Sequence, residues 1–281
     1  MLLTILAIIV VLPSQARADM GPKPSIVINF EGLEGKTYYV TLLSSVKSTG
    51  PHNALIDDES YARYHEGDDD YEVFLKFVEY QDTDGYYFLQ FFQDCTESHQ
   101  FRWTYYPPKE FKILLYFPDT DHFIVSDQVY ERYAFDSYFS AEISDTDISV
   151  SKSYDYTTEV LSLLIRIALT IIAELAIALL FGFRERRVFR FILQVNVLTQ
   201  VALNLALNII NYYSGALVFI FFYVLLEIVV VIVEAIIYTL YMRKKSTTHI
   251  PAWKPGLYAL VANVASFALG RRLAVWIPGI F

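Results

Sequence analysis

The chain has 281 residues, of which 54% are hydrophobic, and it carries a formal net charge of −9. Residues 19–157 hold 26 acidic and 10 basic side chains, a net charge of −16, whereas residues 158–281 hold 5 acidic and 11 basic ones. This excess of acid argues against a nucleic-acid partner, because nucleic-acid binding depends on Lys and Arg meeting phosphates. It indicates either a surface that faces a protein partner or one that is simply solvated.

The N-terminal run Met1–Leu12 is apolar and is followed by Pro13 and by the small-residue pair Ala16-x-Ala18. Such a run is too short to span a bilayer, and the small residues are typical of a signal-peptidase site. We therefore expect residues 1–18 to be a signal peptide and residues 19–157 to be exported. An uncleaved N-terminal anchor is the alternative.

Residues 19–157 contain short segments in which apolar and polar residues alternate, with many aromatic and β-branched side chains and with turn residues between them. That pattern predicts strands. The predicted strands are Ser25–Phe30, Thr37–Ser44, Tyr71–Tyr80, Tyr86–Gln93, His99–Tyr105, Phe111–Phe117, His122–Ser126 and Tyr138–Ile143. Their number and spacing predict an antiparallel β-sandwich of the immunoglobulin-like kind.

We find no nucleophile–base pattern in this part of the chain, and its histidines lack metal-ligand spacing. Asp82 and Asp84 stand before Gly85 as in a calcium loop, but the acidic residue that would complete such a loop is missing. A weak calcium site and a plain turn are both open, and no cofactor is expected. The aromatic runs favour a binding module, because outward Tyr and Trp side chains serve contact faces.

The second half contains four apolar runs, each about 20 residues long, as a membrane-spanning helix requires. They cover residues 160–183, 191–210, 216–241 and 256–277. Basic residues concentrate in the loops 184–190 and 242–255, so the positive-inside rule places both loops in the cytoplasm and the C-terminus outside. Residues 158–281 are thus predicted to form a four-helix transmembrane bundle.

Three of the apolar runs contain carboxylates, Glu174, Glu227 and Glu234. A charge at the centre of a bilayer costs about 2.5–3.5 kcal/mol or more, so such residues usually serve a function. Helical spacing turns them toward further polar residues, with Asn196, Glu234 and Asn263 about 10 Å deep and Gln200, Glu227 and Ser266 in a second layer. The predicted polar cluster comprises Arg166, Glu174, Asn196, Gln200, Asn204, Glu227, Glu234, Asn263 and Ser266.

Three roles for the predicted cluster are open. Its polar side chains can join the helices by hydrogen bonds, and its carboxylates can bind a cation or pass protons. Peptide hydrolysis is the third role, with Glu227 or Glu234 activating water and Asn196 or Asn263 stabilising an oxyanion. Arg166 is placed to pair with Glu227 or to reach the membrane surface.

Four motifs carry a resemblance to known proteins. They are Glu174-x(7)-Gly182-Phe-Arg184, Asn196-x-x-Thr199-Gln200-x(3)-Asn204, Glu227-x(6)-Glu234-Ala-x-x-Tyr238 and Asn263-x-x-Ser266-Phe-x-x-Gly270. With them the chain resembles a widespread family of bacterial membrane proteins that have a signal peptide, a β ectodomain and a glutamate-containing helical bundle. The resemblance implies this architecture and no particular activity. A fainter likeness to glutamic-type intramembrane proteases lacks their paired Glu-Glu-x-x-x-Arg.

The sequence therefore predicts a polytopic membrane protein in which an exported β domain binds a partner or ligand and is coupled to a polar-cored helical bundle. We expect the lipid bilayer and a protein partner or a second copy as its contacts, within a larger assembly. A glutamic-type intramembrane peptidase and a proton- or cation-coupled transport component are the alternatives.

Overall fold

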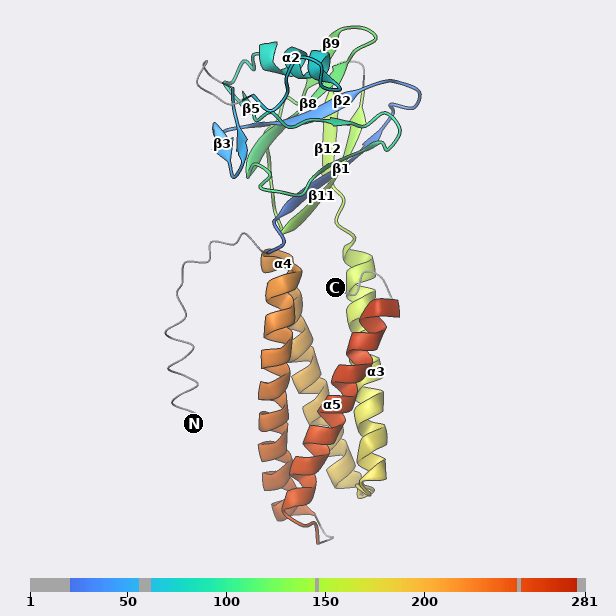
Figure 1. Cartoon of the computed structure of the whole chain (residues 1–281). Helices are drawn as coiled ribbons and strands as arrows, with labels where there is room; N and C mark the ends of the chain where they lie inside the picture. Colours follow the sequence, from blue (N-terminus) through green and yellow to red (C-terminus); the bar gives the residue numbers. More distant parts are fainter. Residues whose placement is uncertain (1–20, 56–61, 145–146, 247–248, 277–281) are drawn as a thin grey trace, which may run out of the picture.

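The computed structural model describes residues 21–55, 62–144, 147–246 and 249–276, with side chains as far as Gly270. It has a β-sheet-rich part, here called the β region (residues 25–152), followed by long apolar helices, here called the helical region (residues 156–276) (Figure 1). The predicted signal peptide, residues 1–18, and the last five residues lie outside the described residues.

The β region contains two main sheets. The first has the strand order β12 (Ile148–Lys152), β11 (Asp136–Ile143), β1 (Ser25–Glu31), β7 (Gln100–Trp103). The second has the order β10 (Tyr130–Glu131), β8 (Glu110–Phe117), β2 (Tyr39–Ser44), β5 (Tyr87–Phe88), with β6 (Gln93–Asp94) also on β2 and β9 (His122–Val125) also on β8. A short hairpin joins β3 (Ser48–Thr49) to β4 (His52–Asn53).

The prediction of a wholly antiparallel sheet is wrong for one pair, because β1 and β11 run parallel, with Ser25 opposite Asp136 and Glu31 opposite Glu142. These strands are separated by about a hundred residues of chain, so no hairpin fixes their direction. The alternation within each strand tells which face is buried and not which strand lies alongside.

One hydrophobic cluster lies between the two sheets and takes its largest side chains from both of them, among them Phe101 and Trp103 of the first sheet and Phe111 of the second. A second cluster covers the outer face of β2 and β8, where Leu43 and Leu114 are buried. Those two strands are therefore apolar on both faces, and they form the centre of the β region.

The segment predicted as the strand Tyr71–Tyr80 is instead the helix α2 (Tyr71–Glu79), which packs Phe74 and Phe77 onto that outer face. Its apolar residues satisfy both a period of two and the helical spacing of three and four. The helix is favoured locally by Glu72 in its first turn and Lys76 in its last, which complement the helix dipole.

Six of the other predicted strands are confirmed as β1, β2, β7, β8, β9 and β11, within a few residues at their ends. The predicted strand Tyr86–Gln93 is interrupted, because Gln90 adopts a left-handed backbone with φ 56° between β5 and β6. Strand β12 was not predicted; it pairs antiparallel with β11, and most of its residues are exposed.

The helical region consists of α3 (Tyr156–Leu180), α4 (Arg186–Lys245) and α5 (Trp253–Trp276). Helix α4 is broken at Gly215, whose φ of 76° and ψ of 177° are not helical. The two arms of α4 fold back on each other there, since Asn196 of the first arm contacts Tyr238 of the second. The four predicted apolar runs correspond to α3, the two arms of α4, and α5.

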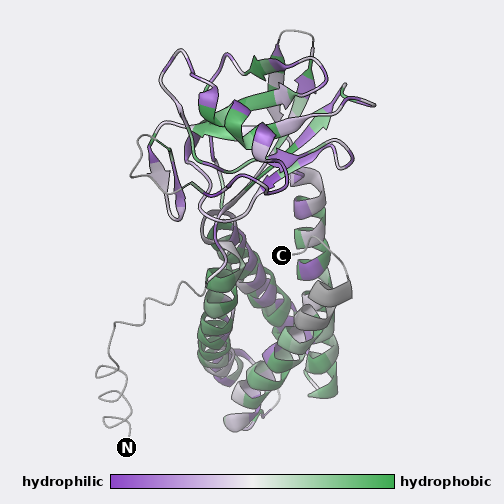
Figure 2. Cartoon of the chain, turned by 45° about the horizontal axis from the view of Figure 1, so that its top comes forward, coloured by the Kyte–Doolittle hydropathy of each residue, from purple (hydrophilic) through white to green (hydrophobic). Residues whose placement is uncertain are grey.

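Within the described residues, α3 and α4 are long and apolar enough to cross a membrane, as judged by length and composition. Their outward surface is made of Leu, Ile, Val and Phe, and Leu198 is 72% exposed. In Figure 2 the ribbon of the helices is coloured mostly as hydrophobic, whereas hydrophilic and hydrophobic residues are mixed in the β region. The helices enclose polar side chains instead.

Candidate functional site

The interior of the helical region contains a buried polar cluster, built from Glu174 of α3, Asn196, Gln200, Asn204, Glu227 and Glu234 of α4, and Asn263 and Ser266 of α5. All of its members are less than 9% exposed. Helical spacing places them on the inward faces of their helices. The structure thus brings together eight of the nine predicted residues.

Glu234 is the most fully bonded member of the cluster. Its Oε1 accepts a hydrogen bond from the hydroxyl of Thr199 at 2.6 Å, and its Oε2 accepts one from Nδ2 of Asn263 at 2.7 Å. The same amide nitrogen donates to the carbonyl of Ala259 at 2.9 Å. One carboxylate therefore joins both arms of α4 to α5.

Glu174 forms a second hydrogen-bonded group. Its Oε1 accepts from the hydroxyl of Ser266 at 2.8 Å and from Nε2 of Gln200 at 3.3 Å, and Asn204 donates to Oε1 of Gln200 at 3.3 Å. The hydroxyl of Tyr258 donates to the main-chain carbonyl of Glu174 at 3.2 Å. These contacts join Glu174 to Gln200 and Ser266 of the predicted second layer.

Asn196 completes the cluster at its end nearest the loops, where its Oδ1 accepts a short hydrogen bond from the hydroxyl of Tyr238. The rings of Tyr238 and Tyr258 lie 5.5 Å apart, and both tyrosines are fully buried. Tyr258 was not among the predicted residues of the cluster, and a tyrosine near the end of a membrane helix is usually an interfacial residue. Its spacing of eight residues before Ser266 was the available signal.

Four polar atoms of the cluster have no hydrogen-bond partner within the described part of the chain, and they are Glu174 Oε2, Glu227 Oε2, Asn263 Oδ1 and Asn196 Nδ2. Three of these are acceptors. Leaving a buried polar group unpaired costs about 1–3 kcal/mol, and these four atoms could each bond a water or an ion. No ion pair joins a described Lys, Arg or His to the three carboxylates.

Glu227 lies beside an apolar groove of about 320 Å³ between the second arm of α4 and α5, which Asn263 and Phe267 also line. The two carboxylates of the turn that resembles a calcium loop have a protein partner. Asp82 and Asp84 do not form an open calcium loop, because both bond the buried Nζ of Lys112, Asp82 at 3.1 Å. Hydrogen bonds to these two carboxylates raise the pKa of Lys112, although burial acts the other way.

A junction joins the two regions at the turn of α4. The main-chain N–H of Phe135 donates to the carbonyl of Tyr212 at 2.9 Å. A Cβ added at Gly215 would lie 2.5 Å from the ring of Phe135, so the close approach of these residues requires glycine. The rings of Tyr154 and Tyr212 lie 5.5 Å apart. The β region therefore contacts α4 directly, in addition to its chain connection to α3.

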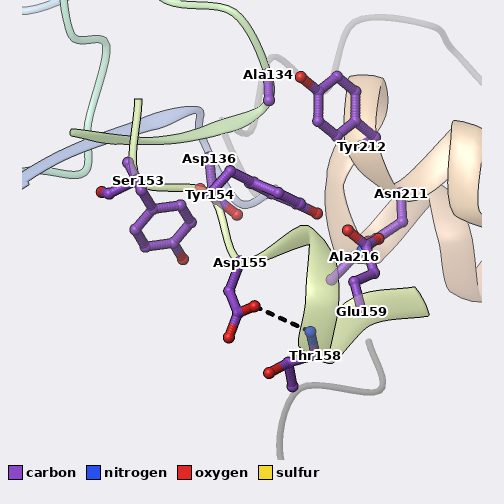
Figure 3. A pocket seen from close by; sticks show the side chains of 11 residues that line it. Ala134, Asp136, Ser153, Tyr154, Asp155, Thr158, Glu159, Asn211, Tyr212 and Ala216 are labelled. Carbon is purple, nitrogen blue, oxygen red and sulfur yellow. Dashed lines mark hydrogen bonds between the residues drawn. The ribbon is translucent and has the colours of Figure 1, made fainter. Parts of the chain in front are cut away.

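Figure 3 shows the cavity of about 400 Å³ beside this junction. Its lining includes three carboxylates, but two of them have structural partners: Asp136 accepts from the hydroxyl of Ser25 at 2.5 Å, and Asp155 caps α3 by accepting from the N–H of Thr158 at 2.9 Å. No group of three potential metal ligands occurs within the described residues. The cavity is therefore part of the junction between the regions.

Comparison of the chain with protein-family models, with curated proteins and with solved structures finds no match. The resemblance to bacterial membrane proteins with a β ectodomain stays a prediction. The function proposed below therefore rests on the buried polar cluster, the junction and the surface of the helices.

Proposed function

We propose that this chain is a polytopic protein of a bacterial plasma membrane. Its helical region would form a four-helix bundle in the bilayer, and its β region a sandwich of the immunoglobulin-like kind on the extracytoplasmic side. The β region binds a partner or ligand, the junction couples it to the buried polar cluster, and the cluster takes up a proton or a cation. The whole acts as a subunit of a larger membrane assembly.

The observation that carries the proposal is the inverted distribution of side chains in the helical region. Leu180 is 85% exposed and Leu198 72%, whereas Glu174 and Asn196 are fully buried. In water this arrangement would expose a large apolar surface, and such surfaces are rare on soluble monomers. Hydrocarbon is the solvent that favours apolar side chains outside and hydrogen-bonded polar ones inside.

The ends of the helices support one orientation in the membrane. Both basic loops lie at the end away from the β region, where Glu185 accepts a hydrogen bond from Ser246 at 3.0 Å and Lys254 lies over the ring of Phe183 (Figure 1). The positive-inside rule then places loops 184–190 and 242–255 in the cytoplasm and residues 19–157 outside. The C-terminus is outside in this topology.

The carboxylates support uptake of a proton or a cation. All side-chain hydrogen bonds to Glu174 and Glu234 within the described residues come from neutral hydroxyl and amide groups. Burying several carboxylates in hydrocarbon as bare anions is costly, so their charge must be cancelled by a proton or a bound cation. The unpaired oxygens of Glu174 and Glu227 are the positions where either would bind.

The peptidase alternative receives no specific support from these contacts. Both oxygens of Glu234 accept hydrogen bonds from protein groups, and the side chain is 1% exposed. A general base for hydrolysis needs a water within hydrogen-bond reach. Glu227 adjoins a groove, yet that groove is lined almost wholly by apolar side chains.

Titration of the cluster tests the uptake. The wild-type chain in mild detergent and the variants Glu174→Gln and Glu227→Gln are followed by infrared spectroscopy of the carboxylic-acid band, against pH and against added Na⁺ or K⁺. We expect a band that changes with pH or cation and that each variant diminishes. Glu185→Gln, at the basic end, is the matched control and leaves the band unchanged. A band insensitive to pH and to both cations contradicts the proposed uptake.

Mass spectrometry of proteins that co-purify with the same four chains tests the assembly. A protein recovered equally with the wild type and every variant supports the subunit role. A protein enriched only with the Glu→Gln variants has the behaviour of a trapped substrate and favours the peptidase. Recovery of the chain alone, at every detergent strength, contradicts the larger assembly.

A further inference from the structure

The β region contains a second cavity, of about 490 Å³, that takes no part in the junction. It lies between the hairpin of β3 and β4, the start of the segment after residue 61, and the end of β7. Its volume falls in the range of about 300–1,000 Å³ that small-molecule sites occupy. It is named the Arg63 pocket and is lined by Pro51, His52, Arg63, Tyr64, Gln90, Phe91, Trp103, Thr104 and Tyr105.

Arg63 is a cation that pairs with no carboxylate of the described residues, although this part of the chain is strongly acidic. Within the described residues its side chain has one hydrogen-bond partner, Nδ1 of His52, and its main-chain N–H donates to Oε1 of Gln90 at 2.8 Å. By contrast, the ammonium groups of Lys76 and Lys112 both pair with aspartates. Arg63 is exposed and lines the pocket, and His52 engages one of the five N–H donors of its guanidinium.

His52 is neutral and so leaves the positive charge of Arg63 uncompensated. Its Nδ1 accepts from Arg63, which requires the ring to carry its proton on the other nitrogen and to be neutral. Burial and the neighbouring Arg63 lower the pKa of His52 to about 4. The histidine therefore contacts the guanidinium as a neutral group, and Arg63 is the charged group of the pocket.

Aromatic rings form the walls and floor. Trp103 is 1% exposed and lies 4.6 Å from the ring of Phe91 and 4.9 Å from that of His52, whereas Tyr105 is 42% exposed. Exposed aromatic faces stack on flat apolar rings and on the C–H face of sugars. Gln90, buried in a left-handed conformation, holds the pocket closed on one side by donating to the carbonyl of Asn53 at 3.0 Å.

We propose that the Arg63 pocket binds a small ligand that bears a carboxylate on a ring. The carboxylate receives the free donors of Arg63, in the two-pronged geometry that a guanidinium offers and an ammonium does not. The ring stacks against Phe91 and Tyr105. This inference rests on the proposed ligand-binding role of the β region and is independent of the buried polar cluster.

Calorimetry and tryptophan fluorescence of the full chain in detergent test the pocket, since Trp103 reports on its floor. The probes are glucuronate and benzoate, which represent an acidic sugar and an aromatic acid, and the uncharged glucose and benzyl alcohol. We expect saturable binding of at least one acid, at least tenfold weaker binding of its uncharged counterpart, and weakening of the acid by added salt. Which acid binds more tightly distinguishes the two sources of the carboxylate.

Variants separate the site from adventitious binding. Arg63→Gln should lower the affinity for the acid at least tenfold. Arg63→Lys keeps the charge but loses the two-pronged geometry of the guanidinium, so its affinity should lie between those of Arg63→Gln and the wild type. Arg102→Gln is the matched control, because this exposed arginine of β7 donates to Oε1 of Gln100 and does not line the pocket. Tyr105→Ala should lower the affinity for both acids, because it removes the aromatic face on which their rings stack.

Three results would overturn the inference: no saturable binding of either acid, equal binding of acids and uncharged counterparts, or equal loss in Arg63→Gln and Arg102→Gln. None of these alters the infrared titration of the helical carboxylates. A negative result for ligand binding at the Arg63 pocket can therefore be distinguished from a negative result for the proposed uptake of a proton or a cation.

Discussion

The β region buries apolar side chains such as Phe101 and Ile113, whereas the helical region buries Glu174 and Glu234 and exposes Leu198. In the proposed membrane arrangement, each region buries the groups that its surroundings solvate poorly. In water these are apolar side chains, and in hydrocarbon they are polar ones. The contrast teaches that burial alone does not identify a core; the chemistry of the buried side chains tells which solvent the surface faces.

The largest expected effect comes from Phe101→Ala in the β region. Removal of a fully buried phenylalanine from a packed core costs about 3–5 kcal/mol, because both transfer energy and cavity terms are lost. The matched change Leu198→Ala, on the outer face of α4, should cost far less in detergent. Chemical denaturation of the two variants in the same micelles measures both values. Equal losses would contradict the proposal that Phe101 lies in a core shielded from water whereas Leu198 faces hydrocarbon.

Glu234→Ala is expected to cost about 2–4 kcal/mol, because the hydroxyl of Thr199 and the amide of Asn263 lose their acceptor within the helices. Glu227→Ala removes a buried carboxylate that has no hydrogen-bonded partner at Oε2, and should cost less than half as much. Unfolding with increasing SDS in mixed micelles provides the comparison. A larger loss for Glu227→Ala would show that the pairing of Glu234 does not stabilise the helices.

Acid should destabilise the β region through His52. The pKa of His52 is about 4 in the folded state and about 6.5 when the chain is unfolded. Between these two pH values the unfolded chain binds a proton at His52 and the folded chain does not. The free energy of unfolding therefore falls as the pH drops from about 6.5 to 4. A difference of about 2.5 pKa units at about 1.4 kcal/mol per unit limits the loss to about 3.5 kcal/mol, and the contribution is constant above pH 6.5.

Denaturation curves at several pH values measure that dependence. His52→Gln should flatten it between pH 6.5 and 4, because no group with a lowered pKa remains at this position. His65→Gln serves as the control, since the side chain of His65 is 64% exposed. An unchanged slope in His52→Gln would show that other groups produce the acid sensitivity.

Gly215→Ala tests the junction and should cost about 1–2 kcal/mol, because the new Cβ meets the ring of Phe135 at a φ of 76° that side chains rarely adopt. Phe135→Ala in the same chain should restore part of the loss by removing the contact but not the backbone strain. Gly256→Ala, with no neighbouring atom within 4 Å of its added Cβ, is the control. Additive losses in the double variant would mean that the two residues do not interact.

Much of the helical region was predictable, because helical spacing alone turns Asn196, Gln200 and Asn204 to one face. The same periodicity places residues on a face but does not set the relative height of two helices. The hydrogen bonds of Glu174 with Gln200 and Ser266 therefore come from the structure alone.

The β region was less predictable. Alternation identified most strands, but it fits α2 equally well over nine residues, and it contains no information on the parallel pairing of β1 with β11. The junction was not predicted at all, since the contact of Phe135 with Gly215 joins segments eighty residues apart. A glycine between two apolar runs reads as a turn, and only the folded chain shows what approaches it.

The junction also has a mechanical consequence. A domain that is tied to a membrane helix by its chain alone can swivel about that single connection. Here the chain enters α3 at Asp155, and the amide of Phe135 holds the carbonyl of Tyr212 at a second point. Free rotation of the β region about the chain connection would therefore have to break the hydrogen bond between Phe135 and Tyr212.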